Sequence, residues 1–100
     1  MSDFAPAIRD LVTANRILAR EDVLDAYGHV SVRHPLRAER FLMACSRPPE
    51  LVEYSDILEY DLSGEAIDAG GRKLYLERFI HAAIFEARPD VHAIVHQNPR

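Results

Sequence analysis

Hydrophobic and polar residues recur along the chain with two different periods, which predicts both helices and strands. The apolar positions between Phe4 and Leu18 follow helical spacing, so residues 3 to about 20 should form an amphipathic helix. The segment 30–33 alternates strictly between apolar and polar side chains, which is the period of a strand. A second short strand is expected at 41–44, and the two should pair as an antiparallel hairpin.

The second half of the chain repeats both periods. Residues 57–62 predict a third strand and residues 65–68 a fourth. From residue 74 to residue 87 the apolar positions return to the helical period. The apolar face of this second helix comprises Leu76, Phe79, Ile80, Ala83 and Ile84. Residues 91–96 are again β-prone.

These elements predict an α+β fold, with a central, mainly antiparallel sheet and flanking helices, in a single domain over residues 1–100. The chain stops within four residues of the last β-prone segment, whereas a buried strand is normally followed by an element that covers it. We therefore expect a sheet with an open edge and an incomplete domain, truncated relative to a larger one.

Composition excludes several classes of protein. The longest apolar run, Phe41–Cys45, is far shorter than the roughly 20 residues of a spanning helix, so no membrane association is expected. Because Cys45 is the only cysteine, no internal disulfide can form, and a cytoplasmic location is expected. The 16 acidic residues outnumber the 12 basic ones and the bases form no cluster, which argues against nucleic-acid binding.

Candidate ligating and catalytic side chains gather in the last quarter of the chain, at Glu77, His81, His92 and His96. On a helix Glu77 and His81 lie one turn apart and share a face. On a strand His92 and His96 also share a face. Imidazoles combined with a carboxylate suit zinc or another divalent first-row ion. A solvated helix pair and hydrogen-bonded strand histidines explain the same spacing, so both interpretations stay open.

Three further positions each have two interpretations. Gly28 and His29 either line a pocket where a strand begins or form a turn beside an exposed histidine. Arg47, in a loop stiffened by Pro48 and Pro49, either clamps an anionic substrate or is an ordinary surface arginine. Cys45 is interpreted as a small buried side chain in preference to a nucleophile.

Several of these residues lie in segments that resemble the class II aldolase and adducin family. The run Ala26–Arg33 is similar to the family's Gly-Asn/His-Val-Ser-x-Arg segment. Glu77, followed by residues 88–90 and 93–96, resembles the family's block of catalytic glutamate and metal-binding histidine. The resemblance runs from about residue 7 to the C-terminus and covers about the first half of the family's domain, whose complete fold has three α/β/α layers.

The resemblance implies a role for each matching residue. Glu77 corresponds to the catalytic acid and base. The substrate-binding residues of the family correspond to Gly28, His29 and Arg47. Where sugar-phosphate aldolases of the family carry a Ser-Ser pair for phosphate, this chain has Tyr75 and Leu76. The chain is in this respect similar to members that resemble decarboxylases of hydroxy-aromatic or ring-cleavage compounds, and an arginine at position 47 would suit a carboxylate.

The implied cofactor is a divalent metal ion, with Zn²⁺ expected first and Mn²⁺ or another divalent ion as alternatives. His96 matches the first metal histidine of the family, and the second ligand position holds Asn98, whose amide oxygen is a weaker donor than imidazole. The third metal histidine of the family would fall beyond Arg100.

The function implied is that of a divalent-metal-dependent carbon–carbon lyase, of aldolase or decarboxylase type, acting on a small hydroxy or oxo carboxylate or a similar compound. Its partners would be this small-molecule substrate and, in a complete domain, further copies of the chain in a homo-oligomer. The alternative is a non-catalytic interaction domain like adducin, or an inactive truncated fragment, and Asn98 favours this alternative.

Overall fold

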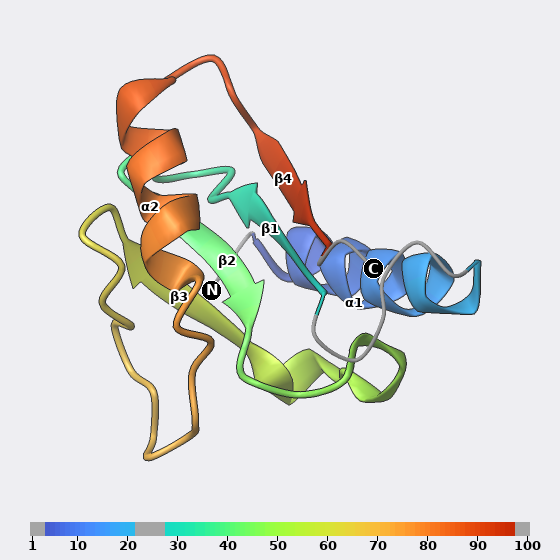
Figure 1. Cartoon of the computed structure of the whole chain (residues 1–100). Coiled ribbons are helices and arrows are strands. Elements are labelled where there is room, and N and C mark those ends of the chain that lie inside the picture. The colour runs from blue at the N-terminus through green and yellow to red at the C-terminus, as the bar shows by residue number, and fades with distance from the viewer. Residues whose placement is uncertain (1–3, 22–27, 98–100) are drawn as a thin grey trace.

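A four-stranded antiparallel sheet forms the centre of the structure, a computed structural model that describes residues 4–21 and 28–97. Its strands are β1 (His29–Arg33), β2 (Arg40–Ala44), β3 (Ile57–Asp61) and β4 (Ala93–His96), in the order β3-β2-β1-β4. The helices are α1 (Ala5–Arg20) and α2 (Arg78–Ala87), with two short 3-10 helices, η1 (Pro49–Leu51) and η2 (Tyr54–Asp56). β4 lies beside β1 (Figure 1), although 59 residues separate Arg33 from Ala93 in the sequence.

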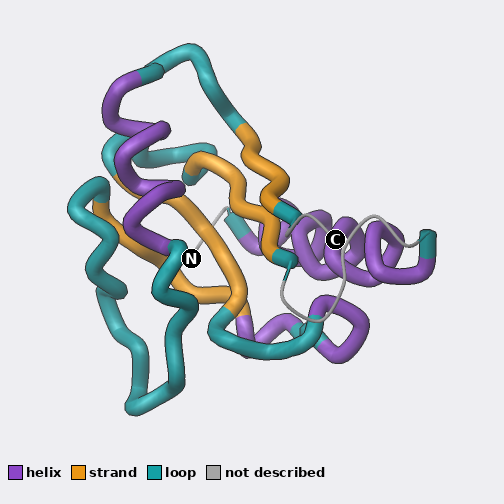
Figure 2. Tube along the Cα trace, viewed as in Figure 1, coloured by secondary structure: helices purple, strands orange, loops and turns teal. Residues whose placement is uncertain are grey.

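The two α-helices cover opposite faces of the sheet, as Figure 2 shows. Ile8 and Leu11 of α1 belong to one hydrophobic cluster, with the β1 residue Val30. Ala82 and Phe85 of α2 belong to a second cluster on the other face. The sheet residues of this second cluster are Phe41, Met43, Leu58 and Tyr60. The predicted α+β fold, with its mainly antiparallel sheet between helices, is confirmed.

The alternation of β1 decides which side chains meet α2. Val30 packs on the α1 side, so its neighbours His29 and Ser31 point to the α2 side. The pairing of β1 with β4 sets His29 opposite His96 and Ser31 opposite Ile94. Because directly paired residues of an antiparallel ladder share a face, His29 and His96 both lie on the side of α2.

Arg33, the last residue of β1, joins α2, the α2–β4 connection and the β1–β2 turn. Its Nε donates to the Val91 carbonyl at 2.9 Å, and its Nη1 donates to the Ala38 carbonyl at 2.6 Å. Its Nη2 donates to the carbonyls of Phe85 and Arg88, at 2.8 and 3.0 Å. The guanidinium carbon also lies 4.9 Å from the centre of the Phe85 ring. One side chain thus fixes the path along which the chain returns from α2 to β4.

The hairpin of β1 and β2 is confirmed, but the predicted strand at residues 65–68 is wrong. Only a single bridge forms there, between Ala66 and Tyr60. The Asp61 carboxylate accepts hydrogen bonds from the backbone N–H groups of Ser63 and Glu65, at 2.9 and 3.1 Å. These bonds close a local turn, and Ile67 is 45% exposed.

The second helix begins later than its period suggests, at Arg78 instead of residue 74. Tyr75 is buried, and its hydroxyl is bound to the backbone of Arg47, which holds residue 75 in the core and outside the helix. The predicted apolar face of this helix is also wrong. α2 buries His81, Ala82 and Phe85, whereas the side chains of Phe79 and Ile80 are 40% and 49% exposed. The buried polar residue has hydrogen-bond partners that hydropathy cannot reveal.

No helix in the ranges 4–21 and 28–97 is long and apolar enough to cross a membrane.

The contacts of Arg33 lead to a stability prediction. Arg33→Lys should lower the free energy of unfolding by about 2–3 kcal/mol, because an ammonium group cannot donate in the forked geometry that reaches several carbonyls at once. Urea denaturation followed by circular dichroism measures the change. Arg9→Lys, on the exposed side of α1, is the matched control and should stay within about 0.5 kcal/mol of the wild type. A fully stable Arg33→Lys chain would show that these hydrogen bonds are dispensable.

Candidate functional site

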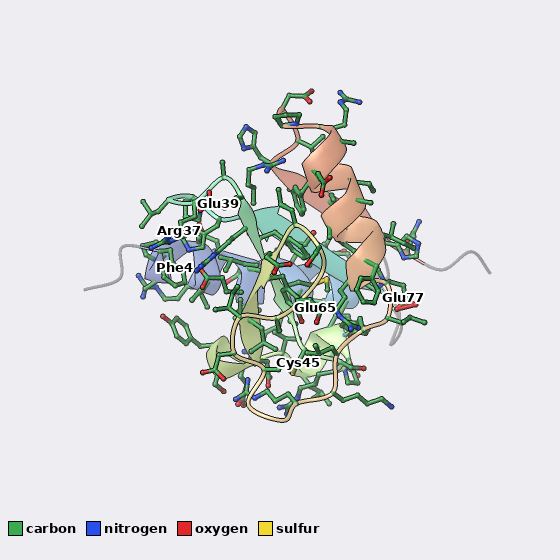
Figure 3. The ribbon with its side chains drawn as sticks, turned by 90° about the vertical axis from the view of Figure 1, so that its left-hand side faces the viewer. Phe4, Arg37, Glu39, Cys45, Glu65 and Glu77 are labelled. Atoms are coloured by element: carbon green, nitrogen blue, oxygen red, sulfur yellow. The ribbon has the colours of Figure 1, made fainter. Side chains whose placement is uncertain are left out.

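Glu77 and three histidines from β1, α2 and β4 meet on the α2 side of the sheet. His29 is the first residue of β1, His96 the last of β4, and His81 lies on the buried face of α2. Glu77 is the N-cap residue of α2, and Figure 3 shows it at the start of this helix, across the molecule from Phe4. Segments that are far apart in the sequence therefore contribute one cluster.

His29 is the centre of this cluster. Its ring stacks on that of His96, with centroids 4.6 Å apart and an interplanar angle of 11°, as the β1–β4 register requires. The Tyr75 ring lies 5.1 Å away on a tilted plane. The His29 Nε2 atom lies 4.0 Å from Glu77 Oε1. This nitrogen is buried and has no hydrogen-bond partner among the described residues.

His81 links His29 to Ser31 through both nitrogens of its ring. Its Nε2 lies 2.7 Å from His29 Nδ1, and its Nδ1 lies 2.5 Å from Ser31 Oγ. The side chains of His81 and Ser31 are fully buried. Sequence reasoning included His81 among the candidates but gave it no role beside His96, and it missed Ser31. The available signals were the helical spacing of His81 from Glu77 and the strand alternation of Ser31 with His29.

Burial favours the neutral form of the His29 and His81 rings. Desolvation is the largest cause that lowers the pKa of His81, and together with the nearby His29 and His96, whose charged forms would repel a charged His81, it brings this pKa to about 3. The pKa of His29 is also lowered, first by burial and then by His96, while the Glu77 carboxylate acts in the opposite direction. A neutral imidazole donates from one ring nitrogen and accepts at the other. The donor in one hydrogen bond of this cluster therefore determines the donor in the next.

Arg47 does not direct its guanidinium to the histidines. Its Nη1 pairs with Asp56 Oδ2 at 3.2 Å. The backbone of Arg47 is nevertheless connected to the site, because the Tyr75 hydroxyl donates to the Arg47 carbonyl at 2.5 Å and accepts from its N–H at 3.3 Å. Gly28, which is buried, immediately precedes His29.

Cys45 is buried on the same side of the sheet, with its Sγ 3.6 Å from Asp56 Oδ1. Burial raises the pKa of this thiol, and the Asp56 carboxylate raises it further. A thiol in this environment is a poor nucleophile, in agreement with its interpretation as a small buried side chain.

The described part of the chain offers an incomplete donor set for a metal ion. Residues 4–21 and 28–97 contain no group of three or more His, Cys, Asp or Glu side chains placed to hold one. His96 has a buried Nδ1 without a hydrogen-bond partner among these residues. His92 is exposed and precedes β4, so it does not join the cluster. Asn98, expected at the second ligand position, lies outside the described residues.

Comparison with known proteins finds relatives over nearly the whole chain. Residues 9–100 match the family described as the class II aldolase and adducin N-terminal domain. The chain is 38% identical over 93 residues to decarboxylase tropJ of Talaromyces stipitatus, covering 91% of this chain and 35% of the relative. It is 33% identical over 104 residues to 3,4-dihydroxyphthalate decarboxylase of Arthrobacter keyseri, covering 95% of this chain and 41% of the relative.

Solved structures show the same fold. An L-fuculose 1-phosphate aldolase from Glaciozyma antarctica superposes with a TM-score of 0.83 at 31% identity, over 96% of this chain and 41% of that one. An aldolase II superfamily protein from Pseudomonas syringae superposes with a TM-score of 0.84 at 30% identity, over 100% of this chain and 42% of that one. This chain thus spans 35% and 41% of the length of the two curated relatives.

The lowered histidine pKa values predict that stability falls in acid. Below about pH 6.5 the unfolded chain takes up protons on its histidines, whereas folded His81 stays neutral down to about pH 3. His81 should therefore cost about 1.4 kcal/mol of unfolding free energy per pH unit below pH ~6.5.

Urea denaturation at a series of pH values between 7.5 and 5 tests this prediction. His81→Gln should flatten the dependence below pH ~6.5 by about 1 kcal/mol per pH unit. His92→Gln, at an exposed position, is the control and should keep the wild-type slope. An equal slope in wild type and His81→Gln would contradict the burial of a neutral imidazole at position 81.

Proposed function

Because the chain belongs to the class II aldolase and adducin N-terminal domain family, we propose that it acts in a divalent-metal-dependent carbon–carbon lyase. The observation that carries this proposal is the convergence of Glu77 and His29, with Glu77 Oε1 4.0 Å from His29 Nε2 beside the stacked ring of His96. A carboxylate, an imidazole with a free nitrogen and a candidate metal ligand then face the same reacting molecule.

Glu77 is the acid and base in this proposal. Its side chain is 40% exposed, so the carboxylate can reach a substrate, and its position at the start of α2 fixes its backbone. In the direction of bond cleavage, a carboxylate here would carry a proton to or from the reacting carbon or its oxygen. A positioned group of this kind typically contributes about 10²–10⁴-fold to the rate.

His29, Gly28 and Arg47 would bind the substrate. The buried Nε2 of His29 offers a hydrogen bond that no described residue takes up. Gly28 lacks a side chain and would allow the substrate close to the backbone beside His29. Arg47 would meet a substrate carboxylate only by sharing its guanidinium with Asp56, since the two are paired at 3.2 Å.

Proteins of this family generally depend on a divalent metal ion, and the described residues fit such an ion in part. His96 would be one ligand, with Asn98 at the second ligand position and Zn²⁺ or Mn²⁺ as the ion. When bound, the ion would supply Lewis-acid stabilisation of negative charge on a substrate oxygen. We place the substrate among small hydroxy or oxo carboxylates, which is supported by the similarity to two decarboxylases.

A non-catalytic interaction domain is the second candidate. Exposed apolar side chains in α2 and just before it favour this candidate, since Ile80 is 49% exposed and Leu76, two residues before the helix, is 73% exposed. A homo-oligomer that buries these side chains would be compatible with either function. Equilibrium dialysis against Zn²⁺ and against Mn²⁺ tests the metal site: stoichiometric binding that His96→Ala abolishes supports the metal-dependent lyase, and binding that His96→Ala leaves unchanged would remove His96 from the metal site.

Removal of the Glu77 carboxylate should abolish most of the activity. We expect Glu77→Gln to lower turnover by about 10²–10⁴-fold while the unfolding free energy changes little, because Glu77 is partly exposed and its ion-pair distance to His29, within the described residues, is as long as 4.0 Å. Release of carbon dioxide from 3,4-dihydroxyphthalate, measured with the complete protein, provides the assay. Glu86→Gln, at an exposed position of α2, is the matched control. Unchanged turnover in Glu77→Gln would remove Glu77 from the mechanism.

A further inference from the structure

The Ser31 hydroxyl fixes the direction of a chain of hydrogen bonds. Ser31 is fully buried, and its Oγ has one hydrogen-bond partner among the described residues, His81 Nδ1 at 2.5 Å. A buried hydroxyl proton needs an acceptor, and an unprotonated imidazole nitrogen is one. The opposite arrangement, with His81 donating to Ser31, would leave the Ser31 proton without an acceptor in a dry environment. Ser31 therefore donates to His81.

The assignment of Ser31 as the donor to His81 also determines which nitrogen of the His29 ring is protonated. Because His81 Nδ1 accepts from Ser31, the single proton of the neutral His81 ring is on Nε2. That Nε2 lies 2.7 Å from His29 Nδ1, so His81 donates and His29 Nδ1 accepts. The proton of the neutral His29 ring is then on Nε2, the nitrogen nearest to Glu77.

A second observation, independent of Ser31, supports the same direction. His29 Nε2 is buried without a hydrogen-bond partner among the described residues, and Glu77 Oε1 lies 4.0 Å from it. A carboxylate oxygen attracts an N–H group and repels a bare nitrogen lone pair. The distance is too long for a direct hydrogen bond and leaves the His29 N–H free for another acceptor.

We propose that Ser31 and His81 are positioning residues that hold His29 as the tautomer protonated on Nε2, so that its N–H is offered beside Glu77 to an anionic oxygen of the substrate. A carboxylate or enolate oxygen is the ligand class that fits, since a buried N–H donor with no other partner binds negative charge strongly. This ligand class rests on the proposed function, whereas the tautomer of His29 does not depend on it.

Long-range proton–nitrogen NMR spectra of the ¹⁵N-labelled chain at about pH 8 test the tautomer directly, because protonated and bare ring nitrogens have well-separated ¹⁵N shifts. We expect both His29 and His81 to be protonated on Nε2 and bare at Nδ1. His29 protonated on Nδ1 would overturn the proposal.

Variants test whether the hydrogen bonds from Ser31 through His81 to His29, called the relay below, set the tautomer of His29. Ser31→Ala should turn the single His29 tautomer into a mixture, and Ser31→Thr, which keeps a hydroxyl, should restore it. His81→Gln keeps a side-chain N–H for His29 Nδ1 and should also preserve the wild-type tautomer. Ser63→Ala, which removes a hydroxyl bonded to Asp61, is the matched control. An unchanged His29 tautomer in Ser31→Ala would show that the relay does not set it and would overturn the proposal.

An activity measurement separates this proposal from the proposed function. Ser31→Ala should lower kcat/KM for 3,4-dihydroxyphthalate by about 10–100-fold, with rescue by Ser31→Thr. If the NMR result holds while Glu77→Gln retains full turnover, the relay stands and the lyase mechanism fails. If Glu77→Gln is inactive while His29 carries its proton on Nδ1, the lyase mechanism stands and the relay fails.

Discussion

The structure depends on directed hydrogen bonds between β1 and α2. On its side facing α2, β1 presents His29, Ser31 and Arg33, where an ordinary sheet would present apolar residues. His81 is hydrogen-bonded to His29 and Ser31, and the backbone carbonyl of Phe85 in α2 accepts a hydrogen bond from Arg33. Burying any of these polar groups without a hydrogen-bond partner would destabilise the fold. α2 and β1 therefore pack in the arrangement that gives each of these groups a partner. Apolar packing of α2 against β2 and β3 supplies the remaining contact.

The same constraint prepares the site for chemistry. The His29 ring contacts the rings of His96 and Tyr75 and is hydrogen-bonded to His81, and these contacts fix its orientation in the sheet. Burial keeps the rings of His29 and His81 uncharged, since desolvation lowers both pKa values. The site therefore combines a buried, neutral imidazole with a partly exposed carboxylate. That combination suits binding and proton transfer at one substrate.

Local sequence patterns predicted most of the elements but only part of the site. Strand alternation in β1 and β2 and the helical period in α1 and α2 are local signals, and they were sufficient for the fold class. The buried face of α2 was not predictable from hydropathy, because His81 is buried by virtue of partners on another strand. The meeting of His29 with His96 depends on the pairing of β1 with β4, which is a long-range contact that no local period specifies. The family resemblance singled out Glu77 and His96, whereas Ser31 required the observed hydrogen bond.

The register of β1 against β4 is the most direct test of this account. Nuclear Overhauser contacts across the two strands, measured on the labelled chain, should connect the His29 and His96 rings and should connect Ser31 with Ile94. A register shifted by one residue would place Val95 opposite His29 and would turn His96 to the α1 side. Contacts between His29 and Val95 in place of His96 would contradict the shared site.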